Sequence, residues 1–346
     1  MPPVAQASDF LAARRSNDRA RVDARWQHDR RTLSQLAINR CLRGLDNPAD
    51  ATDDRLLNWL WGFLTEPTWV VSAHLPSRDL PALAGHNIDL AAAEMAALLA
   101  EVREVLAPWI DSVSATLADS IVAEIDRKVL TPFVVGDASV AWWKDPASHV
   151  SNWAGVCAGS VLTACRSLTA QGHPRPQEEA LALDVLRRFA DRGFTRGGEC
   201  DEGMGYWIYG VAFACLGWSR LEADELAANV DVARLAQIAD YPRRAHLGGD
   251  VFFSGNDSGL RASPPHYLTP WLAAATGNRF LAAWGAMPPA PAVAPIDPSP
   301  QPSSSNEWKR RADPSDAHLR HFGQILRLFA APPPPAKAED SAARAT

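Results

Sequence analysis

Apolar residues that recur every three and four positions run through most of residues 32–284, and this spacing restricts the chain to helical folds. Residues 88–106 show the spacing most clearly, because Met95, Leu98 and Val102 fall on one helix face. The same spacing predicts helices over residues 88–106, 113–129, 154–168, 181–192, 206–221, 222–239 and 270–284. Pro108 is expected to end or bend the first of these helices, and Pro132 is expected to close the second.

Strand signals are nearly missing from the sequence. Residues 251–253 (Val-Phe-Phe) form the best short strand candidate. Long helices joined by loops, with almost no alternation of polar and apolar residues, predict an all-α fold class.

The composition along the chain predicts three parts. The predicted parts are a polar, Arg-rich and loose lead-in over residues 1–24, a helical domain over 25–287, and a Pro- and Ser-rich region over 288–346. Within the last part, residues 288–305 are expected to be an extended linker, 316–329 one short amphipathic helix, and 332–346 a disordered tail.

The overall composition excludes several classes of protein. Apolar residues make up 47% of the chain, which is enough for a sizeable core, and the formal net charge of -6 offers no basic surplus for nucleic acid. An acidic polymer would have to meet local positive groups. The five cysteines form no CxxC pair, which argues against a disulfide framework and against a zinc cluster.

Signals for membranes, export and cofactors are not found in the sequence. No stretch reaches the roughly 18 uninterrupted apolar residues of a membrane span. The N-terminus has no basic start followed by an apolar segment, so we expect a cytoplasmic protein, or a periplasmic one if the start site is misassigned. No phosphate-binding loop, dinucleotide fingerprint, HExxH pair or EF-hand is present, and we therefore expect no cofactor and no metal.

Tryptophan is unusually frequent, with 13 tryptophans against four tyrosines. Flat indole faces pack well on the C–H edges of sugar rings. Most of these tryptophans are nevertheless expected to pack in the core, which is where aromatic side chains mainly contribute.

Three segments carry a distinctive pattern. The first combines residues 66–69 (Glu-Pro-Thr-Trp), His74 and residues 86–90 (His-Asn-Ile-Asp-Leu). The second is Trp142-Trp143 followed by residues 152–157 (Asn-Trp-Ala-Gly-Val-Cys). The third, over residues 197–210, reads Gly-Gly-Glu-Cys-Asp-Glu-Gly-Met-Gly-Tyr-Trp-Ile-Tyr-Gly.

In order and spacing, these segments resemble the helical domain of the heparinase II/III group of polysaccharide lyases. The resemblance covers roughly residues 55–285. It implies an incomplete (α/α) toroid of antiparallel helix pairs and β-elimination on a uronic-acid-containing poly- or oligosaccharide. Family enzymes normally carry a C-terminal β-sandwich domain, whereas this chain continues into a Pro-rich region, so a partner chain is a possible source of that domain. Several members also have a histidine where this chain has Trp153.

Elimination from a uronate needs a group that neutralises the carboxylate, a base for the C5 proton and an acid for the departing C4 oxygen. Asn152 is the candidate neutraliser, because it begins the helix over 154–168, where free N–H groups and the helix dipole favour an anion. Asn152 can equally be an ordinary N-cap residue.

Glu202, Tyr206 and Tyr209 share one face if their segment is helical, since they are four and three residues apart. The family uses a tyrosine as base or acid, and we choose Tyr206 over Tyr209. A phenol with a pKa near ~10 is a poor base in water, but a cationic cleft lowers that pKa. Both rings can also be core residues with hydrogen-bonded hydroxyls.

The histidines that could reach a cleft are His74, His149, His246 and His266. His246 is our choice for the second proton-transfer group, with His74 next. The residues expected to contact substrate are Trp153, Glu202, Tyr209, Trp207, His74 and Arg244. Arginines such as Arg244 attract carboxylates by bidentate pairing, although they can also be solvated surface residues.

Other functions fit part of the same pattern. The missing β-sandwich domain leaves open a non-catalytic, carbohydrate-binding remnant of a lyase. A uronate C5 epimerase would share the abstraction of the C5 proton. An (α/α) glycosidase would need two separated carboxyl groups, and the adjacent Asp201 and Glu202 point in different directions on a helix.

Overall fold

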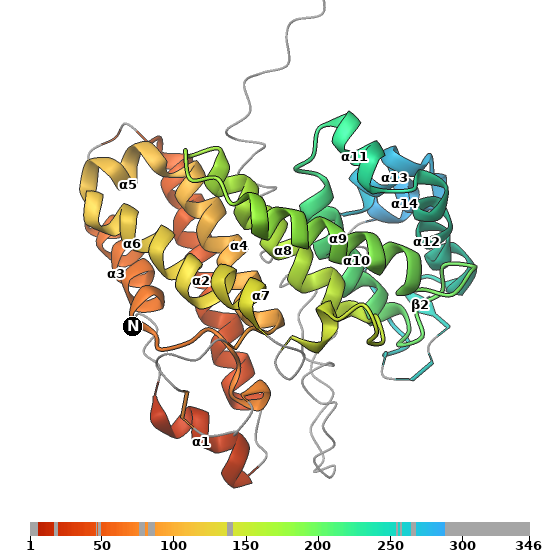
Figure 1. Cartoon of the computed structure of the whole chain (residues 1–346), viewed down its shortest axis with the longest axis horizontal. Coiled ribbons are helices and arrows are strands. Elements are labelled where there is room, and N and C mark those ends of the chain that lie inside the picture. Colours follow the sequence, from red (N-terminus) through yellow and green to blue (C-terminus); the bar gives the residue numbers. More distant parts are fainter. Residues whose placement is uncertain are drawn as a thin grey trace, which may run out of the picture.

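Helices form most of the ordered backbone in the computed structural model, which confirms the predicted all-α class (Figure 1). The structure describes residues 6–16, 20–45, 47, 50–75, 80–81, 87–136, 141–253, 255–256, 258–263 and 268–287. The first half of the helical part contains α1 (Ala7–Ser16), α2 (Ala20–Arg43), α3 (Ala51–Thr65), α4 (Leu90–Val105), α5 (Ala107–Val113), α6 (Ala115–Ile125) and α7 (Thr131–Val135). The second half contains α8 (Asn152–Thr169), α9 (Pro176–Arg192), α10 (Met204–Trp218), α11 (Ala223–Asn229), α12 (Val232–Ala245), α13 (Thr269–Thr276) and α14 (Arg279–Gly285).

The N-terminal region is more ordered than the sequence suggested. The prediction of a loose lead-in over residues 1–24 is wrong over Ala7–Ser16 and from Ala20 onward, because α1 and the start of α2 lie there. Asp9 of α1 pairs with Arg25 of α2, and Phe10 packs against the core. This ion pair and the apolar contact of Phe10 help to hold α1 against the rest of the fold.

Both predicted proline breaks fall near helix ends, but only the first acts as expected. Pro108 lies in the first turn of α5, directly after α4 has ended. Pro132 was expected to close the helix before it, yet it lies in the first turn of α7. The chain reaches that helix through a π-helical turn, η2 (Asp126–Leu130), in which the N–H of Thr131 donates to the carbonyl of Asp126. The wider turn lets the helix pass the proline and continue to Val135.

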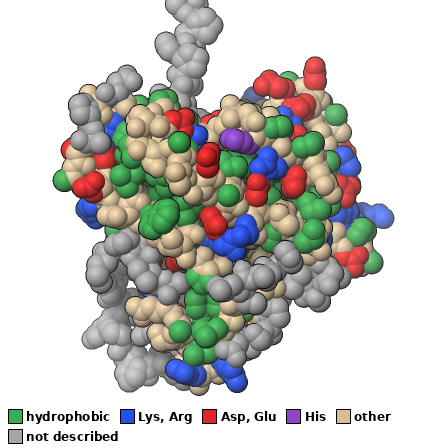
Figure 2. All heavy atoms as spheres, turned by 60° about the vertical axis from the view of Figure 1, so that its left-hand side comes forward, with side chains coloured by type: hydrophobic (Ala, Val, Ile, Leu, Met, Phe, Trp, Pro, Cys, Tyr) green, Lys and Arg blue, Asp and Glu red, His purple; other side chains and the backbone are tan. Residues whose placement is uncertain are grey.

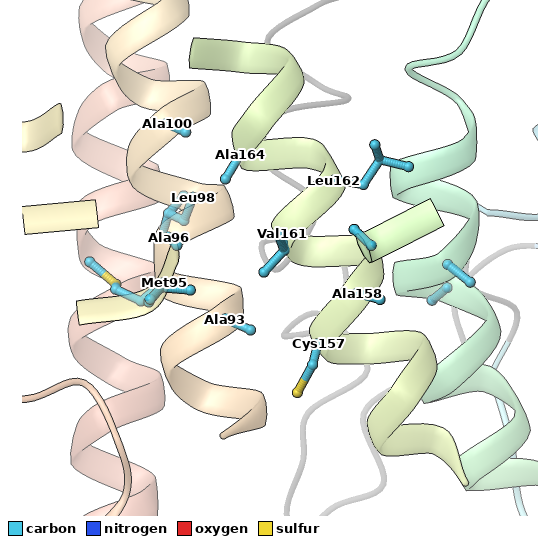
Figure 3. Close-up of a cluster of buried hydrophobic side chains, with 14 of the residues drawn as sticks. Ala93, Met95, Ala96, Leu98, Ala100, Cys157, Ala158, Val161, Leu162 and Ala164 are labelled. Atoms are coloured by element: carbon cyan, nitrogen blue, oxygen red, sulfur yellow. The ribbon is translucent and has the colours of Figure 1, made fainter. Parts of the chain in front are cut away.

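Helix α8 runs through the middle of the molecule, with α4 on one side and α9 and α10 on the other (Figure 1). Small side chains such as Ala93 and Ala100 of α4 face Cys157 and Ala164 of α8 (Figure 3). This packing of short side chains brings the two helix axes close together over several turns.

Glycines let α10 approach α8 even more closely. A Cβ atom on Gly159 would lie 2.1 Å from the carbonyl oxygen of Phe213, and one on Gly155 would lie 2.7 Å from the carbonyl oxygen of Gly210. From the other helix, a Cβ on Gly217 would lie 2.9 Å from the carbonyl oxygen of Gly159. No side chain fits at these positions at the present spacing of the helices.

Two of the predicted helices are each split into a pair. The prediction over 222–239 covers α11 and α12, which separate where Asp231 accepts hydrogen bonds from the N–H groups of Ala233 and Arg234. The prediction over 270–284 covers α13 and α14, which separate at Gly277, with a φ of 68°, and at the cap residue Asn278. In both cases a local capping residue decides the boundary, and the apolar spacing does not reveal it.

The predicted strand at residues 251–253 is present as β2 (Val251–Phe252), which pairs antiparallel with β1 (His246–Gly248). The pair forms a short hairpin after α12. The linker, amphipathic helix and tail predicted over 288–346 lie outside the described residues.

The surface shows no separation of charge on the face in Figure 2, where acidic and basic side chains are interspersed. None of the described helices has both the length and the apolar character needed to cross a bilayer.

Candidate functional site

A pocket of about 110 Å³ lies where the N-terminal ends of α8 and α10 meet the loop that follows α9. Three residues expected at the site line it together: Asn152, Glu202 and Tyr206. Its other polar lining residues include His149, Arg192 and Asp201. Residues from three separate segments therefore converge on one small space.

Asn152 is the most buried polar residue of the pocket, with 4% of its surface exposed. The N-cap of α8 is Ser151, whose hydroxyl accepts from the N–H of Trp153, so Asn152 is not the N-cap. The Nδ2 of Asn152 donates to Glu202 at 2.6 Å. Its Oδ1 is buried and has no donor among the described residues. An unsatisfied buried acceptor costs roughly 1–3 kcal/mol, so this oxygen is a natural contact for a ligand that supplies a donor.

Glu202 precedes α10 and does not lie on it. Helix α10 begins at Met204, after Gly203 with a φ of 86°. The expectation that Glu202 shares a helix face with Tyr206 and Tyr209 is therefore wrong. The hydroxyl of Ser258 donates to the carbonyl of Glu202 at 2.7 Å and accepts from the N–H of Gly205 at 2.9 Å. This clamp across the turn fixes the carboxylate next to Asn152.

The side chains of Tyr206 and Tyr209 have different neighbours, although the two residues are about one helical turn apart. Tyr206 lines the pocket. The hydroxyl of Tyr209 donates to Glu94 of α4, and Glu94 pairs with Arg30 of α2 at 3.5 Å. Tyr209 thus belongs to a network that ties three helices together, and Tyr206 is the tyrosine that lines the pocket.

The structure does not bring His246 to this pocket. Its Nε2 lies 2.9 Å from the carbonyl oxygen of Gly249, and its ring packs between Phe252 and Phe280, at 5.1 and 5.3 Å between centroids. His149 lines the pocket instead. The sequence could have indicated His149 as a pocket residue, because it precedes Asn152 by three residues and the chain leads directly from it into the first turn of α8. His266 lies outside the described residues.

An aromatic group lies on the other side of the first turn of α8. The ring of Trp153 is 4.9 Å from His74 and 5.8 Å from Trp142, between centroids. The Nδ1 of His74 is 2.8 Å from Asp89, the cap residue of α4. All three rings are half-buried, so part of the group remains open to solvent.

Trp207 and Arg244 were expected to contact substrate, but in the structure both stabilise the fold. Trp207 is completely buried, and its indole N–H donates to the carbonyl of Ile238 at 3.1 Å, which leaves no surface for a sugar. Arg244 pairs with Glu199 and donates to the carbonyl of Gly197. Its guanidinium lowers the pKa of Glu199 through their hydrogen bond. Arg244 therefore holds the glycine-rich turn in place.

The charges around the pocket are mixed. Asp201 and Glu202 contribute carboxylates, and Arg192 uses its guanidinium to donate to the carbonyl of Pro146 at 2.7 Å. Burial raises the pKa of the Cys200 thiol to about 12, so this thiol stays neutral. No group of three or more metal-ligating side chains is found in the part of the chain that the structure describes.

Comparison of the sequence with protein-family models and with curated proteins finds no match. The pocket is therefore interpreted from its own residues.

Proposed function

We propose that this chain is a lyase-like protein that binds a uronic-acid-containing poly- or oligosaccharide at the pocket of Tyr206. The observation that supports the proposal is that Tyr206 lines the same pocket as the Asn152–Glu202 pair. With it we propose that the helices form an incomplete (α/α) toroid, as the resemblance to the heparinase II/III group implies. A partner chain that completes the cleft is part of the same proposal.

Asn152 is proposed to meet the substrate carboxylate. An amide has two N–H donors, and the bond to Glu202 occupies one of them. The second N–H can donate to a carboxylate oxygen, which withdraws charge and makes the C5 proton more acidic. The free Oδ1 can accept from a neighbouring sugar hydroxyl. Glu202 then acts as the residue that orients the amide.

In the proposed reaction, the side-chain oxygen of Tyr206 takes the C5 proton. The electron pair of the broken C5–H bond forms the C4–C5 double bond, and the C4–O bond breaks. The leaving oxygen takes a proton from His149 or from the newly protonated Tyr206. His149 replaces His246 in this role because it lines the pocket and is exposed there.

One observation favours a second candidate, a carbohydrate-binding protein without catalysis. The carboxylates of Asp201 and Glu202 line the same pocket, and they repel an anionic sugar. A pocket rich in hydrogen-bond acceptors favours the hydroxyl groups of sugars. Binding without turnover would follow if that repulsion keeps the uronate away from Tyr206.

Incubation with alginate, heparin, chondroitin and hyaluronan separates these possibilities. Elimination produces an unsaturated product that absorbs ultraviolet light, and Tyr206→Phe is expected to abolish that signal. Tyr241→Phe is the matched control, because Tyr241 is buried in α12 and does not line the pocket. If elimination survives Tyr206→Phe, the assignment of the base is wrong.

The other outcomes identify the alternatives. Binding to a polymer without any new product indicates a carbohydrate-binding protein. New reducing ends without absorbance indicate a glycosidase. Inversion at C5 without cleavage indicates an epimerase.

A further inference from the structure

A second cavity, of about 40 Å³, lies between α1, α2, the end of α3 and the segment that follows α3. Four aromatic rings line it, those of Phe10, Trp26, Phe63 and Trp69. The cavity shares no lining residue with the pocket of Tyr206, so it is a separate space.

Glu66 lines this cavity with a carboxylate that has no partner. The residue directly follows α3, and among the residues that the structure describes none forms a hydrogen bond or an ion pair with its side chain. The side chain is half-buried, and burial raises the pKa of its carboxyl group to about 7. A carboxylate that is partly removed from water and unpaired is destabilised, so it favours contact with a positive group.

The positive side chains around Glu66 already have other partners. These side chains are Lys128, Arg25 and Arg30. Lys128 lies 3.1 Å from Glu124, Arg25 pairs with Asp9, and Arg30 lies 3.5 Å from Glu94. The chain therefore supplies cations near Glu66 without supplying one that pairs with it.

The charges that line the cavity exclude anions. Asp9, Asp29 and Glu66 line it together with one basic residue, Arg25. A divalent metal ion needs several converging oxygen ligands, and the described part of the chain contains no group of three or more side chains that could hold one. An organic cation remains, because its carbon atoms can pack against aromatic walls.

The two tryptophans of the cavity show that their rings accept cations. The guanidinium of Arg30 lies over the ring of Trp26, and the ammonium group of Lys128 lies 4.5 Å from the ring centroid of Trp69. An aromatic face attracts a cation through its quadrupole, and it also offers apolar surface to an alkyl group.

We propose that this cavity binds a small alkylammonium ion. The ammonium group pairs with the carboxylate of Glu66, and the alkyl group packs against the aromatic rings of Trp26 and Trp69. The proposal does not depend on the function proposed above.

Nuclear magnetic resonance of the full-length chain, titrated with ethylammonium chloride, tests the proposal. The indole N–H signals of Trp26 and Trp69 report on the cavity, and the N–H of Trp69 donates to the carbonyl of Phe63 at 2.9 Å. Both signals are expected to shift to saturation with a Kd of the order of millimolar, because the ion has only about three non-hydrogen atoms. Trp61 of α3, which is 54% exposed and does not line the cavity, is the internal reference.

Two substitutions and two other solutes are the controls. Glu66→Gln removes the charge with little change of shape, and it is expected to weaken binding by about tenfold or more. Glu104→Gln is the matched control, because the side chain of Glu104 on α4 is 25% exposed and does not line the cavity. Sodium chloride at the same ionic strength and ethanol at the same concentration are expected to cause no saturable shift.

The dependence of binding on pH gives a second measurement. Below pH 7 the ion must displace the proton of Glu66, so the affinity is expected to be about tenfold higher at pH 8 than at pH 6. Burial lowers the pKa of Lys128 to about 8, and burial raises the pKa of Asp29. Glu66→Gln separates the effects of these two groups, because it should remove only the part of the pH dependence that belongs to Glu66.

Three results would overturn the proposal. In the first, ethylammonium causes no saturable shift of Trp26 and Trp69. In the second, ethanol causes the same shifts at the same concentrations, which means that the cavity binds apolar groups without regard to charge. In the third, binding is as strong in Glu66→Gln as in the unmodified chain, which means that another carboxylate holds the ion.

Discussion

Substitution of Gly159 by alanine tests the close packing of α8 and α10. The added Cβ atom would lie 2.1 Å from the carbonyl oxygen, 2.4 Å from the carbonyl carbon of Phe213 and 2.8 Å from the nitrogen of Ala214. These are backbone atoms, so no side-chain rotation relieves the contact. Ordinary contact begins at 3.4 Å, and the helices must therefore separate locally by about 1.3 Å.

The free energy of unfolding changes through two opposing effects. Overpacking of a core costs roughly 1–3 kcal/mol, and a rigid backbone contact belongs at the upper end of that range. Replacing glycine by alanine inside a helix stabilises it by about 1 kcal/mol. The expected net loss is about 2 kcal/mol, which corresponds to a fall in Tm of roughly 4–8 °C for a domain of this size.

Thermal unfolding followed by circular dichroism measures this loss. Gly205→Ala is the matched control in α10, because its Cβ would meet only the Ser258 side chain, at 3.2 Å. We expect the control to change Tm by no more than about 2 °C. A Gly159→Ala protein as stable as the unmodified chain would refute the reasoning, since it would mean that α8 and α10 are not in backbone contact.

Further predictions concern buried charges and a helix cap. Asp53→Ala should lower the free energy of unfolding, measured by chemical denaturation, by about 3–5 kcal/mol, because it leaves the fully buried guanidinium of Arg40 without its carboxylate. Asp240→Ala, at an exposed ion pair, should lower it by less than about 1 kcal/mol. Burial raises the pKa of Glu66 from 4.5 to about 7, so the folded state binds this proton more tightly and stability falls as the pH rises between these values. The Tm of Glu66→Gln relative to the unmodified chain should therefore increase from pH 4.5 to 7 and stay constant above; a flat difference contradicts this. Asp231→Ala should cost about 1 kcal/mol, measured by thermal unfolding, because two N–H groups of α12 lose their acceptor.

The helices of the core were predictable because their apolar residues are regularly spaced. Residues 88–106 and 154–168 correspond closely to α4 and α8, where burial on one face decides the structure. Segment boundaries were less predictable. Asp231 and Asn278 are the N-caps of α12 and α14, and each boundary depends on this one side chain, which leaves the apolar spacing almost unchanged.

The pocket was predictable only in part, because motifs place residues along the chain and not in space. Asn152, Glu202 and Tyr206 come from motifs, and the structure brings them to one pocket. His246 and Trp207 come from the same kind of reasoning, yet His246 packs between aromatic rings and Trp207 is in the core. Which side of a turn or helix meets a neighbour depends on packing between distant segments, such as the contact of Ser258 with the turn at Glu202.

The carboxylate of Asp89 has a mechanical consequence for His74. One oxygen accepts from the N–H of Ala92 at 2.8 Å, and the other lies 2.8 Å from His74 and accepts from the N–H of Val71 at 3.1 Å. A single, fully buried side chain thus joins the imidazole, its loop and the first turn of α4 into one rigid unit. The ring shares the immobility of a core helix, so a ligand that contacts it loses little entropy in ordering it.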